Sequence, residues 1–271
     1  MDLVDTHCHI HSAGQPQGER MTTELWAKHP EHPNAELLQK RATVVGVRRL
    51  ICVGCDLNDS QLAVACAQDR PGCWATVGVH PHEAARYAHA PAMRNSLARL
   101  AASPKVVAIG ECGLDYYYMH SKKADQVHIL EFQMEVALTR QLPLVFHVRE
   151  AYDDFWPLFD AHPGLRGVMH SFTDSAHNLE EALKRGLFIG VNGIATFTKS
   201  DSQKDMYRKI PLEKMVLETD APYLTPTPYR GTINEPKYIR EIAEFMAKLR
   251  DTDVGSVASA TTMNAQILFG V

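Results

Sequence analysis

The stretch VDTHCHIHS, residues 4–12, decides between the two folds that the rest of the sequence allows. It begins in an apolar run that predicts a first strand, and three histidines and an aspartate then follow within seven residues. An open, doubly wound sheet would have a glycine-rich phosphate-binding turn after its first strand. Because this sequence has a histidine cluster at that point instead, it favours a closed barrel.

Strand-like runs recur along the chain, separated by helical patterns. They lie at residues 3–4, 50–53, 75–79, 106–109, 144–148, 167–169, 187–191 and 215–217. Between them, apolar residues recur every three or four positions, as Val127, Leu130 and Met134 do. Eight strands that alternate with helices predict an α/β fold, a (β/α)8 TIM barrel with a parallel sheet. We expect a single domain over residues 1–271, since no linker-like tract interrupts the pattern.

Composition restricts the class of protein and its partners. Hydrophobic residues make up 45% of the chain and charged residues 22%, as in a globular protein with a sizeable core. The net charge of −4 argues against holding a long nucleic acid by bulk charge, but it leaves room for a local phosphate site. We see neither a signal peptide nor an apolar run of about 18 residues, so we expect a cytoplasmic protein without a membrane partner. The oligomeric state is open, and we expect a monomer.

Metal-competent or charged side chains follow five of the predicted strands. His7 and His9 are two residues apart, so both can point into the mouth of the barrel. The later strands are followed by Glu111 and Asp115, His147 and Arg149, His170, and Glu218 and Asp220. Packing alone does not explain this set, because the interior of such a barrel favours branched apolar residues. Imidazoles and carboxylates that converge at the carboxyl ends of strands predict a two-metal hydrolytic site.

Other polar residues are expected to have supporting roles. We expect Glu218 and Asp5 each to orient a ligand histidine, since such imidazoles usually donate their second N–H to an acceptor. Cys52 and Cys55 have the spacing of a metal-binding pair, but without a second pair we expect no structural zinc there. We expect all six cysteines of the chain to be reduced thiols.

A polar, proline-containing segment at residues 13–34 predicts a long loop over the active face, with a short helix at residues 22–28. Three histidines lie in or near this loop: His11, His29 and His32. We expect each of them to be solvated, since a lone histidine in a polar loop is usually neither a ligand nor a substrate contact.

Short motifs follow one another in a fixed order along nearly the whole chain. They are DTHCHIH, VGVHPHE, IGECGLDYY, FHVREA, HSFTD, LETDAPYLTP, NEP and TTMNAQILFG. Together they resemble the TatD family of metal-dependent deoxyribonucleases, which are amidohydrolase-like barrels. The resemblance implies two divalent cations, Mg²⁺ or Mn²⁺ in activity with Zn²⁺ as another candidate. It also implies the ligands His7, His9, Glu111, His147, His170 and Asp220, with Glu111 as the bridge.

The expected function is therefore ester-bond hydrolysis of the kind that the resemblance implies. We expect a 3′–5′ exodeoxyribonuclease that acts on single-stranded or frayed DNA ends, with RNA as a second candidate substrate. Asp220 is expected to take the proton of a metal-bound water, and Glu111 to share the catalytic role. The expected substrate contacts are Arg149 and His80, which would hold phosphate oxygens, and Asp115.

Two other functions stay open from the sequence. One is a metal-dependent ester or amide hydrolase on the same barrel, for example one that cleaves aminoacyl-tRNA esters; the other is a non-catalytic scaffold. Many barrel amidohydrolases carry a carbamylated lysine where this chain has Glu111, which favours phosphodiester cleavage. The sequence departs from the family pattern at Cys112, Asp174 and Gln266. Asp174 adds negative charge near the expected phosphate site, so it leaves the substrate range open.

Overall fold

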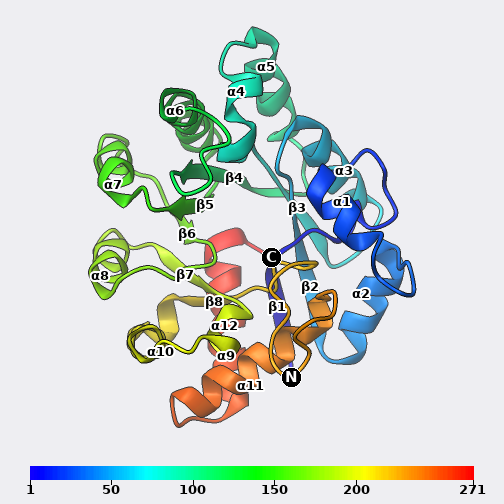
Figure 1. Ribbon diagram of the computed structural model, residues 1–271. Coiled ribbons are helices and arrows are strands. Elements are labelled where there is room, and N and C mark those ends of the chain that lie inside the picture. Colours follow the sequence, from blue (N-terminus) through cyan, green and yellow to red (C-terminus); the bar gives the residue numbers. More distant parts are fainter.

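The computed structural model describes residues 1–271, apart from the side chain of Pro91. Within this range, eight parallel strands lie side by side in sequence order (Figure 1). They are β1 Leu3–Cys8, β2 Val47–Val53, β3 Cys73–Val77, β4 Val106–Asp115, β5 Leu144–Arg149, β6 Gly167–Met169, β7 Phe188–Val191 and β8 Met215–Leu217. The ring is closed by residues that follow β8, since Asp220 N–H donates to the carbonyl of His7 and His9 N–H to that of Ala221, each over 2.8 Å. The structure confirms the predicted barrel.

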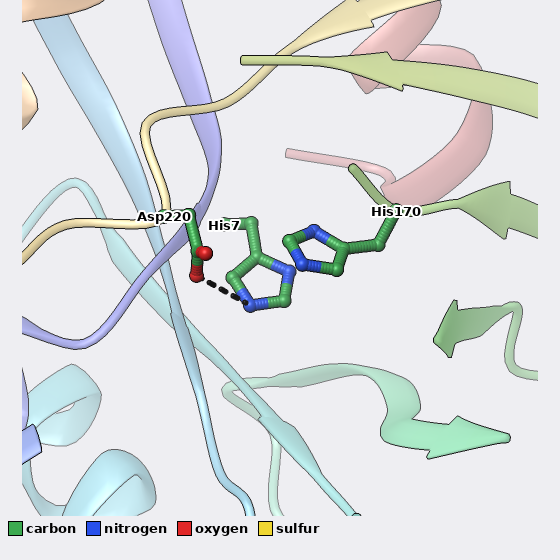
Figure 2. A group of neighbouring side chains, drawn as sticks. All are labelled: His7, His170 and Asp220. Carbon is green, nitrogen blue, oxygen red and sulfur yellow. Dashed lines mark ion pairs between the residues drawn. The ribbon is translucent and has the colours of Figure 1, made fainter. Parts of the chain in front are cut away.

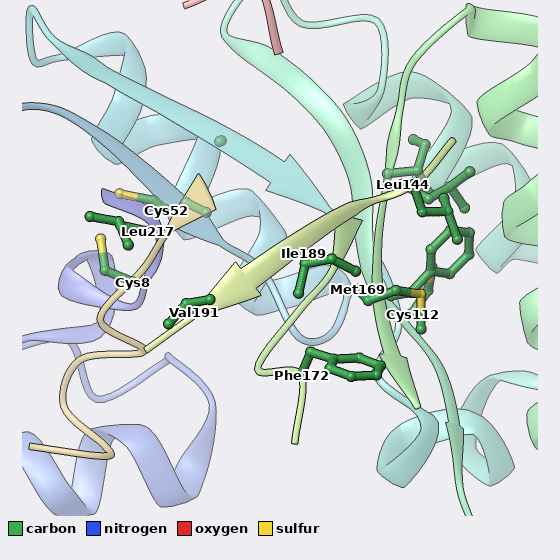
Figure 3. Close-up of a cluster of buried hydrophobic side chains, with 14 of the residues drawn as sticks. Cys8, Cys52, Cys112, Leu144, Met169, Phe172, Ile189, Val191 and Leu217 are labelled. Carbon is green, nitrogen blue, oxygen red and sulfur yellow. The ribbon is translucent and has the colours of Figure 1, made fainter. Parts of the chain in front are cut away.

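Helices surround the strands and cover the outer face of the ring (Figure 1). They include α2 Ala35–Val44, α3 Leu57–Gln68, α4 Ala84–Tyr87, α5 Pro91–Leu100, α6 Lys123–Arg140, α7 Tyr152–Asp160, α8 Ala176–Lys184, α9 Ile194–Phe197, α10 Asp201–Lys209 and α11 Ile239–Leu249. Outward strand residues such as Leu144 and Ile189 pack beneath them (Figure 3). Burying one such side chain contributes about 1.5–3 kcal/mol. No helix in the described part of the chain is both long and apolar enough to cross a bilayer.

The interior of the barrel has an apolar floor and a polar mouth. The strand residues of the floor are Val4, Ile51, Val53, Val107, Ala108, Val145, Val168, Phe188 and Val216. α12, Val254–Phe269, closes the floor with Leu268 and Phe269. Two positions beyond Val145 and Val168 stand His147 and His170, and side chains two apart share a face. The mouth is therefore lined by the predicted metal ligands.

β1 holds one residue more than β2 just below the mouth. The pairing passes from Asp5–Leu50 to Cys8–Cys52, so β1 advances three residues while β2 advances two. Side chains alternate between the faces of a strand, and an extra residue reverses that alternation beyond it. Cys8 therefore packs outward in the main hydrophobic cluster, and His7 is turned into the interior, where it is fully buried.

β4 has the same irregularity. Its pairing with β5 passes from Ile109–Leu144 to Cys112–Phe146, and Ile109 and Cys112 both face outward into the main hydrophobic cluster. Strict alternation would place residues three apart on opposite faces. The extra residue turns Glu111 into the interior, where it is 4% exposed.

The strands β4 and β5 approach each other very closely at Gly113, and this allows a test of the fold. We expect Gly113→Ala to destabilise the protein, because a Cβ there would lie 1.8 Å from the carbonyl oxygen of His147. Gly231→Ala is the matched control, since Gly231 also has a positive φ of +92° but its Cβ would meet nothing within 4 Å. The control should lose about 1–2 kcal/mol from backbone strain alone.

In urea unfolding, Gly113→Ala should lose about 2 kcal/mol or more beyond the control. Equal stability of the two variants would contradict the close approach of these strands.

The helix within residues 13–34 begins two residues before the predicted 22–28. α1, Arg20–Trp26, starts after Glu19, whose carboxylate accepts hydrogen bonds from two backbone N–H groups of the first turn at 2.9 and 2.7 Å. These bonds satisfy donors that a helix start leaves unpaired. Glutamate is not among the usual capping residues, so the sequence pattern did not reveal this start.

The segment of residues 13–34 is fixed to the mouth at two points. The indole N–H of Trp26 donates to the carbonyl of His9 over 3.0 Å. The hydroxyl of Thr22 lies 3.0 Å from that of Tyr223, which belongs to the loop after β8. The segment therefore lies over the β1 side of the mouth, as predicted.

The expectation of solvated histidines around this segment was wrong for two of the three. His11 is 2% exposed, and its Nε2 lies 3.1 Å from Asp59 Oδ1. His29 is 5% exposed, with Nε2 3.4 Å from Glu235 Oε1. Both are buried because the segment folds back onto the barrel, where carboxylates of α3 and of the loop before α11 face them. His32 is exposed, as predicted.

Candidate metal centre

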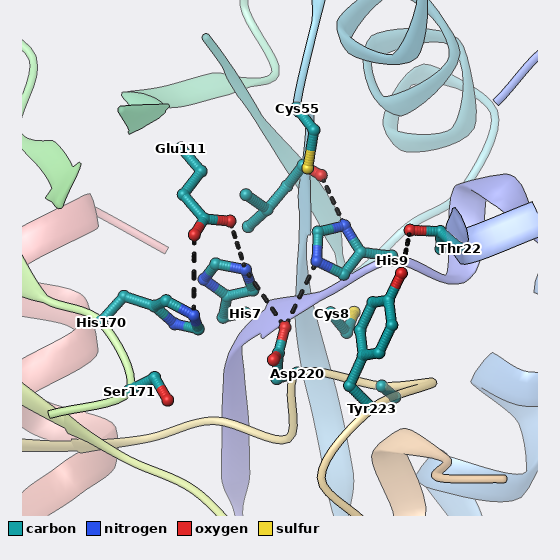
Figure 4. A network of polar contacts seen from close by, with 12 residues as sticks. His7, Cys8, His9, Thr22, Cys55, Glu111, His170, Ser171, Asp220 and Tyr223 are labelled. Atoms are coloured by element: carbon teal, nitrogen blue, oxygen red, sulfur yellow. Dashed lines mark hydrogen bonds and ion pairs between the residues drawn. The ribbon is translucent and has the colours of Figure 1, made fainter. Parts of the chain in front are cut away.

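The six predicted metal ligands converge at the carboxyl ends of the strands. They are His7 from β1, His9 just after it, Glu111 from β4, His147 from β5, His170 after β6, and Asp220 after β8. Figure 4 shows five of them, all except His147, with their polar atoms turned toward one another from different strands. The barrel thus gathers into one cluster residues that are far apart in the sequence.

Glu111 is the centre of this cluster. Its Oε2 lies 3.3 Å from His7 Nε2, whereas its Oε1 lies 3.0 Å from His147 Nδ1 and 3.8 Å from His170 Nε2. Burial alone would raise the pKa of Glu111, but the charges of His170, His80 and His7 hold this pKa well below its ordinary value. The two oxygens of one ionised carboxylate therefore face different sets of nitrogen donors.

Asp220 completes the β1 side of the cluster. Its Oδ1 lies 3.6 Å from His7 Nε2 and 3.4 Å from His9 Nε2, and the ring of His7 stacks on that of His170 at 3.6 Å (Figure 2). The backbone of Asp220 has a φ of +59°, a left-handed conformation that aspartate tolerates better than most residues. Burial would raise the pKa of Asp220, but the hydrogen bond with His9 and the charges of His170 and His7 lower it.

The residues present fit a metal ion. Both ring nitrogens of His7 are buried and have no hydrogen-bond partner among the described residues, which is costly unless another ligand satisfies them. The donor atoms of His7, His9 and Glu111 lie within 4.8 Å of one another, and so do those of His7, His170 and Asp220. Imidazole nitrogens and carboxylate oxygens are the ligands that divalent cations take in hydrolytic sites.

Polar groups behind the cluster orient two of its imidazoles. His9 Nδ1 lies 2.8 Å from the carbonyl of Val53, which leaves Nε2 directed at Asp220. Glu218 Oε1 lies 3.0 Å from His170 Nδ1 and accepts a hydrogen bond from the N–H of Ser171 over 2.6 Å. This position of Glu218 agrees with the orienting role predicted from the sequence.

Asp5 does not support a ligand imidazole, in contrast to the prediction. It is fully buried and accepts hydrogen bonds from the backbone N–H groups of His7 and Thr219 and from the Thr219 hydroxyl, at 3.2, 2.9 and 2.5 Å. Burial raises the pKa of Asp5 to about 7 against these bonds. Asp5 therefore joins the backbones of β1 and of the turn after β8, an arrangement that depends on barrel closure.

Asp115 was expected to contact substrate, but the structure buries it completely. Its Oδ1 accepts hydrogen bonds from the backbone N–H groups of Tyr117 and Tyr118 at 3.0 and 2.8 Å. Its Oδ2 lies 3.0 Å from His147 Nε2 and 3.1 Å from His82 Nε2. A carboxylate with no exposed surface cannot bind substrate directly, so Asp115 is placed to hold the ring of His147.

The two other expected substrate contacts lie in different surroundings. His80 Nε2 is 3.5 Å from Glu111 Oε1, and burial lowers the pKa of His80 to about 4. Its donor atom lies within 4.8 Å of those of Glu111 and His147, so His80 joins the donor cluster itself. Arg149 is exposed at the rim, with its guanidinium 4.0 Å from the centre of the Tyr117 ring.

Sequence reasoning missed two residues whose donor atoms lie close to those of the predicted metal ligands. His80 was not predicted as a metal donor, although its place after β3, at the same end of the barrel as the ligands, was a usable signal. Asp59 was missed altogether, and its donor atom lies within 4.8 Å of those of His9 and His11. An aspartate in the first turn of α3 resembles any helix-start residue, so its sequence position carries no such signal.

Comparisons with known proteins agree with this site. The sequence matches the family model described as TatD related DNase over residues 4–270. A Citrobacter rodentium protein named 3'-5' ssDNA/RNA exonuclease TatD is 38% identical over 240 residues, which cover 85% of this chain and 90% of that protein. A Bacillus subtilis protein, described as the uncharacterized metal-dependent hydrolase YabD, is 32% identical over 274 residues, 99% of each chain.

Comparison with solved structures points to the same family as comparison of sequences. The crystal structure of YJJV, a TatD homologue from Escherichia coli K12, has a TM-score of 0.86 with this structure at 26% identity and covers 99% of this chain and 98% of that one. The family model matches nearly the whole chain, including every residue of the metal-competent cluster. The protein therefore belongs to the family of TatD-related DNases.

Proposed function

We propose that the protein is a two-metal phosphodiesterase that removes nucleotides from the 3′ end of single-stranded or frayed DNA, with RNA as a second substrate. The observation that carries this proposal is the position of Glu111, whose two oxygens lie 3.3 Å from His7 and 3.0 Å from His147. One carboxylate in this position can bridge two cations. The Citrobacter rodentium relative, named a 3'-5' ssDNA/RNA exonuclease, supports the choice of substrate and direction.

Each cation would have a separate set of histidines, and Glu111 would be common to both sets. Those that would hold the first are His7, His9, Asp220 and Glu111, and those that would hold the second are Glu111, His147 and His170, with His80 beside them. Such cations lower the pKa of a water molecule and neutralise charge on the phosphoryl group. Mixed imidazole and carboxylate ligands suit Mn²⁺ and Zn²⁺, and carboxylates also suit Mg²⁺.

Asp220 is the residue proposed to take the proton of the attacking water. Its side chain is 15% exposed, so a water at the mouth can reach it. It is ionised at neutral pH because the hydrogen bond with His9 and the neighbouring histidines outweigh the effect of burial on its pKa. His80 and Arg149 are proposed to hold phosphate oxygens, one inside the mouth and the other at its rim.

The surroundings of the mouth favour attack on a strand end. The segment of residues 13–34 lies over the β1 side, held by the contacts of Trp26 with His9 and of Thr22 with Tyr223. The chain carries a net charge of −4, so it does not attract a long backbone by bulk charge.

We further propose that the protein works in the cytoplasm. All six cysteines are free thiols within the described residues, and most of them are buried. Unpaired cysteines are typical of reducing compartments.

Nuclease activity is tested with chelator-treated protein and a single-stranded DNA oligonucleotide labelled at its 5′ end. Added Mn²⁺ or Mg²⁺ should produce a ladder that shortens from the 3′ end. Asp220→Asn should lower kcat by about 10²–10⁴-fold, because it removes the proton acceptor. Asp154→Asn, which changes a carboxylate bonded to the hydroxyl of Tyr116 away from the site, is the control and should keep the wild-type rate.

The proposal fails if Asp220→Asn cleaves as fast as wild type or if mononucleotides leave from the 5′ end. Hydrolysis of aminoacyl esters or cyclic amides without cleavage of DNA or RNA would instead identify a different hydrolase on the same barrel.

Metal stoichiometry tests the bridge independently of activity. Equilibrium dialysis against Mn²⁺ should give two bound ions per wild-type chain. His147→Ala should keep one, because His147 lies on only one side of Glu111. Glu111→Gln should weaken both, since each oxygen of this carboxylate serves one site. A single ion in wild type, or two in Glu111→Gln, would contradict the bridge.

The proposed role of Asp115 is to position His147, and it is tested through stability and metal binding together. Asp115→Asn should lower the free energy of unfolding by about 3 kcal/mol, since it disrupts a buried network of charge-assisted hydrogen bonds. It should also weaken Mn²⁺ binding by about 10–100-fold, the usual cost of losing such a partner of a ligand histidine. A variant with unchanged metal affinity would show that Asp115 only stabilises the fold.

A further inference from the structure

We propose that Tyr117, Tyr118 and Arg149 form a stacking platform that binds an unpaired nucleobase of the substrate strand next to the metal centre. The inference rests on the proposed function, and it adds the reason why the substrate is single-stranded. It starts from two neighbouring tyrosines that the fold leaves in solvent. Their exposed fractions are 53% for Tyr117 and 51% for Tyr118.

The platform has the geometry of an open aromatic corner. The rings of Tyr117 and Tyr118 are perpendicular, with centroids 4.8 Å apart. The guanidinium of Arg149 lies 4.0 Å from the centre of the first ring and 4.8 Å from that of the second. Within the described residues, Arg149 makes no ion pair with a carboxylate, so its charge is available to a ligand.

The platform is rigidly connected to the metal centre. Asp115 binds the backbone N–H groups of both tyrosines with one oxygen and lies 3.0 Å from His147 Nε2 with the other. Arg149 follows His147 by two residues on β5, so the two side chains leave the strand on the same side. A nucleobase that stacks on the platform therefore has a fixed position relative to His147 and the other metal-competent residues.

A row of rings joins the platform to the interior of the mouth. Tyr118 meets His82 edge-on at 5.5 Å, and His82 meets His80 at 4.4 Å. The ring of His120 lies parallel to that of Tyr118, with centroids 5.8 Å apart and an interplanar angle of 9°. His80 in turn lies 3.5 Å from Glu111. A DNA strand whose terminal phosphate reaches the cations can thus place a neighbouring base against these rings.

The neighbouring Tyr116 is a useful comparison, because its hydroxyl and its ring both have partners within the fold. Its hydroxyl donates to Asp154 over 2.8 Å, and the amino group of Lys123 lies 3.7 Å from the centre of its ring. Both the polar tip and one face of Tyr116 therefore have partners in the fold. No hydrogen bond of the hydroxyls of Tyr117 and Tyr118 is found among the described residues.

The chemistry of these groups suits a nucleobase. Aromatic side chains stack on the flat face of any base, and a guanidinium adds cation–π attraction and a hydrogen-bond fork for a phosphate. Stacking requires a base that is not paired in a helix, so the platform selects single strands without reading sequence. It also supplies affinity that a protein with a net charge of −4 cannot obtain from bulk charge.

Fluorescence anisotropy of a labelled single-stranded DNA oligonucleotide, with Ca²⁺ in place of activating metal, tests the platform by binding alone. We expect Tyr117→Ala and Tyr118→Ala each to raise Kd about tenfold, and Tyr118→Trp to restore binding. The control Tyr116→Phe should bind as wild type, since its hydroxyl serves only the fold. An oligonucleotide with abasic residues at its 3′ end should bind wild type as weakly as the normal oligonucleotide binds Tyr118→Ala. The affinity of this abasic oligonucleotide should not fall further when Tyr118→Ala replaces wild type.

Cleavage kinetics separate this inference from the proposed function. Tyr118→Ala should raise KM about tenfold on DNA and leave kcat unchanged, and it should cleave an oligonucleotide with abasic residues at its 3′ end with the same kinetics as wild type. Wild-type cleavage of DNA with a KM that neither the tyrosine variants nor the abasic residues alter would overturn the platform and leave the nuclease standing. Equal oligonucleotide affinity of wild type and both alanine variants would overturn it whether or not DNA is cleaved.

Discussion

The metal-competent cluster depends on one constraint, the extra residue in each of the strands β1 and β4. Without it, His7 and Glu111 would stand on the outer face, beneath the helices, and the interior would receive their apolar neighbours instead. Both irregularities lie beyond an apolar floor that a regular barrel would continue upward. A change of one residue in register thus converts a hydrophobic core into a site that can hold charge. Bulges of this kind often lie beside active sites, where they redirect a side chain.

A buried group of imidazoles and carboxylates is stable only if each ring is held in one orientation. Here a backbone carbonyl and two carboxylates do this. His9 is held by a backbone carbonyl, His170 by Glu218 and His147 by Asp115. Each partner occupies the nitrogen that points away from the centre, so the other nitrogen is directed inward. His7 has no such partner among the described residues, and its ring stacks on that of His170 at 3.6 Å.

The features that the sequence predicted are those that depend on a local pattern. Apolar runs located most strands within two residues, as the expected 144–148 and the observed β5, Leu144–Arg149, show. Polar residues that follow such runs identified the cluster, because strand ends of a parallel barrel meet at one face. The first strand was predicted only as residues 3–4, although β1 is Leu3–Cys8, because its aspartate and histidines did not resemble strand interior.

The errors concern residues whose surroundings come from distant parts of the chain. Asp115 is buried because a turn of tyrosines and two histidines from β5 and the loop after β3 enclose it. His29 is buried because Glu235 is brought to it across some 200 positions of sequence. The residues next to Asp115 and His29 in the sequence do not reveal either of these surroundings. The extra residues in β1 and β4 belong to the same class, since register is a property of two strands and not of one.

The floor of the barrel has a consequence for the order in which the molecule is made. Val4, near the amino terminus, shares one apolar cluster with Leu268 and Phe269 of α12. During synthesis on a ribosome, the first strand therefore waits for the last helix before its inner face is covered. The turn that closes the ring beside His7 also comes late, at Asp220. A nascent chain consequently lacks a complete metal centre until Asp220 has emerged, and the floor beneath that centre stays open until α12 follows.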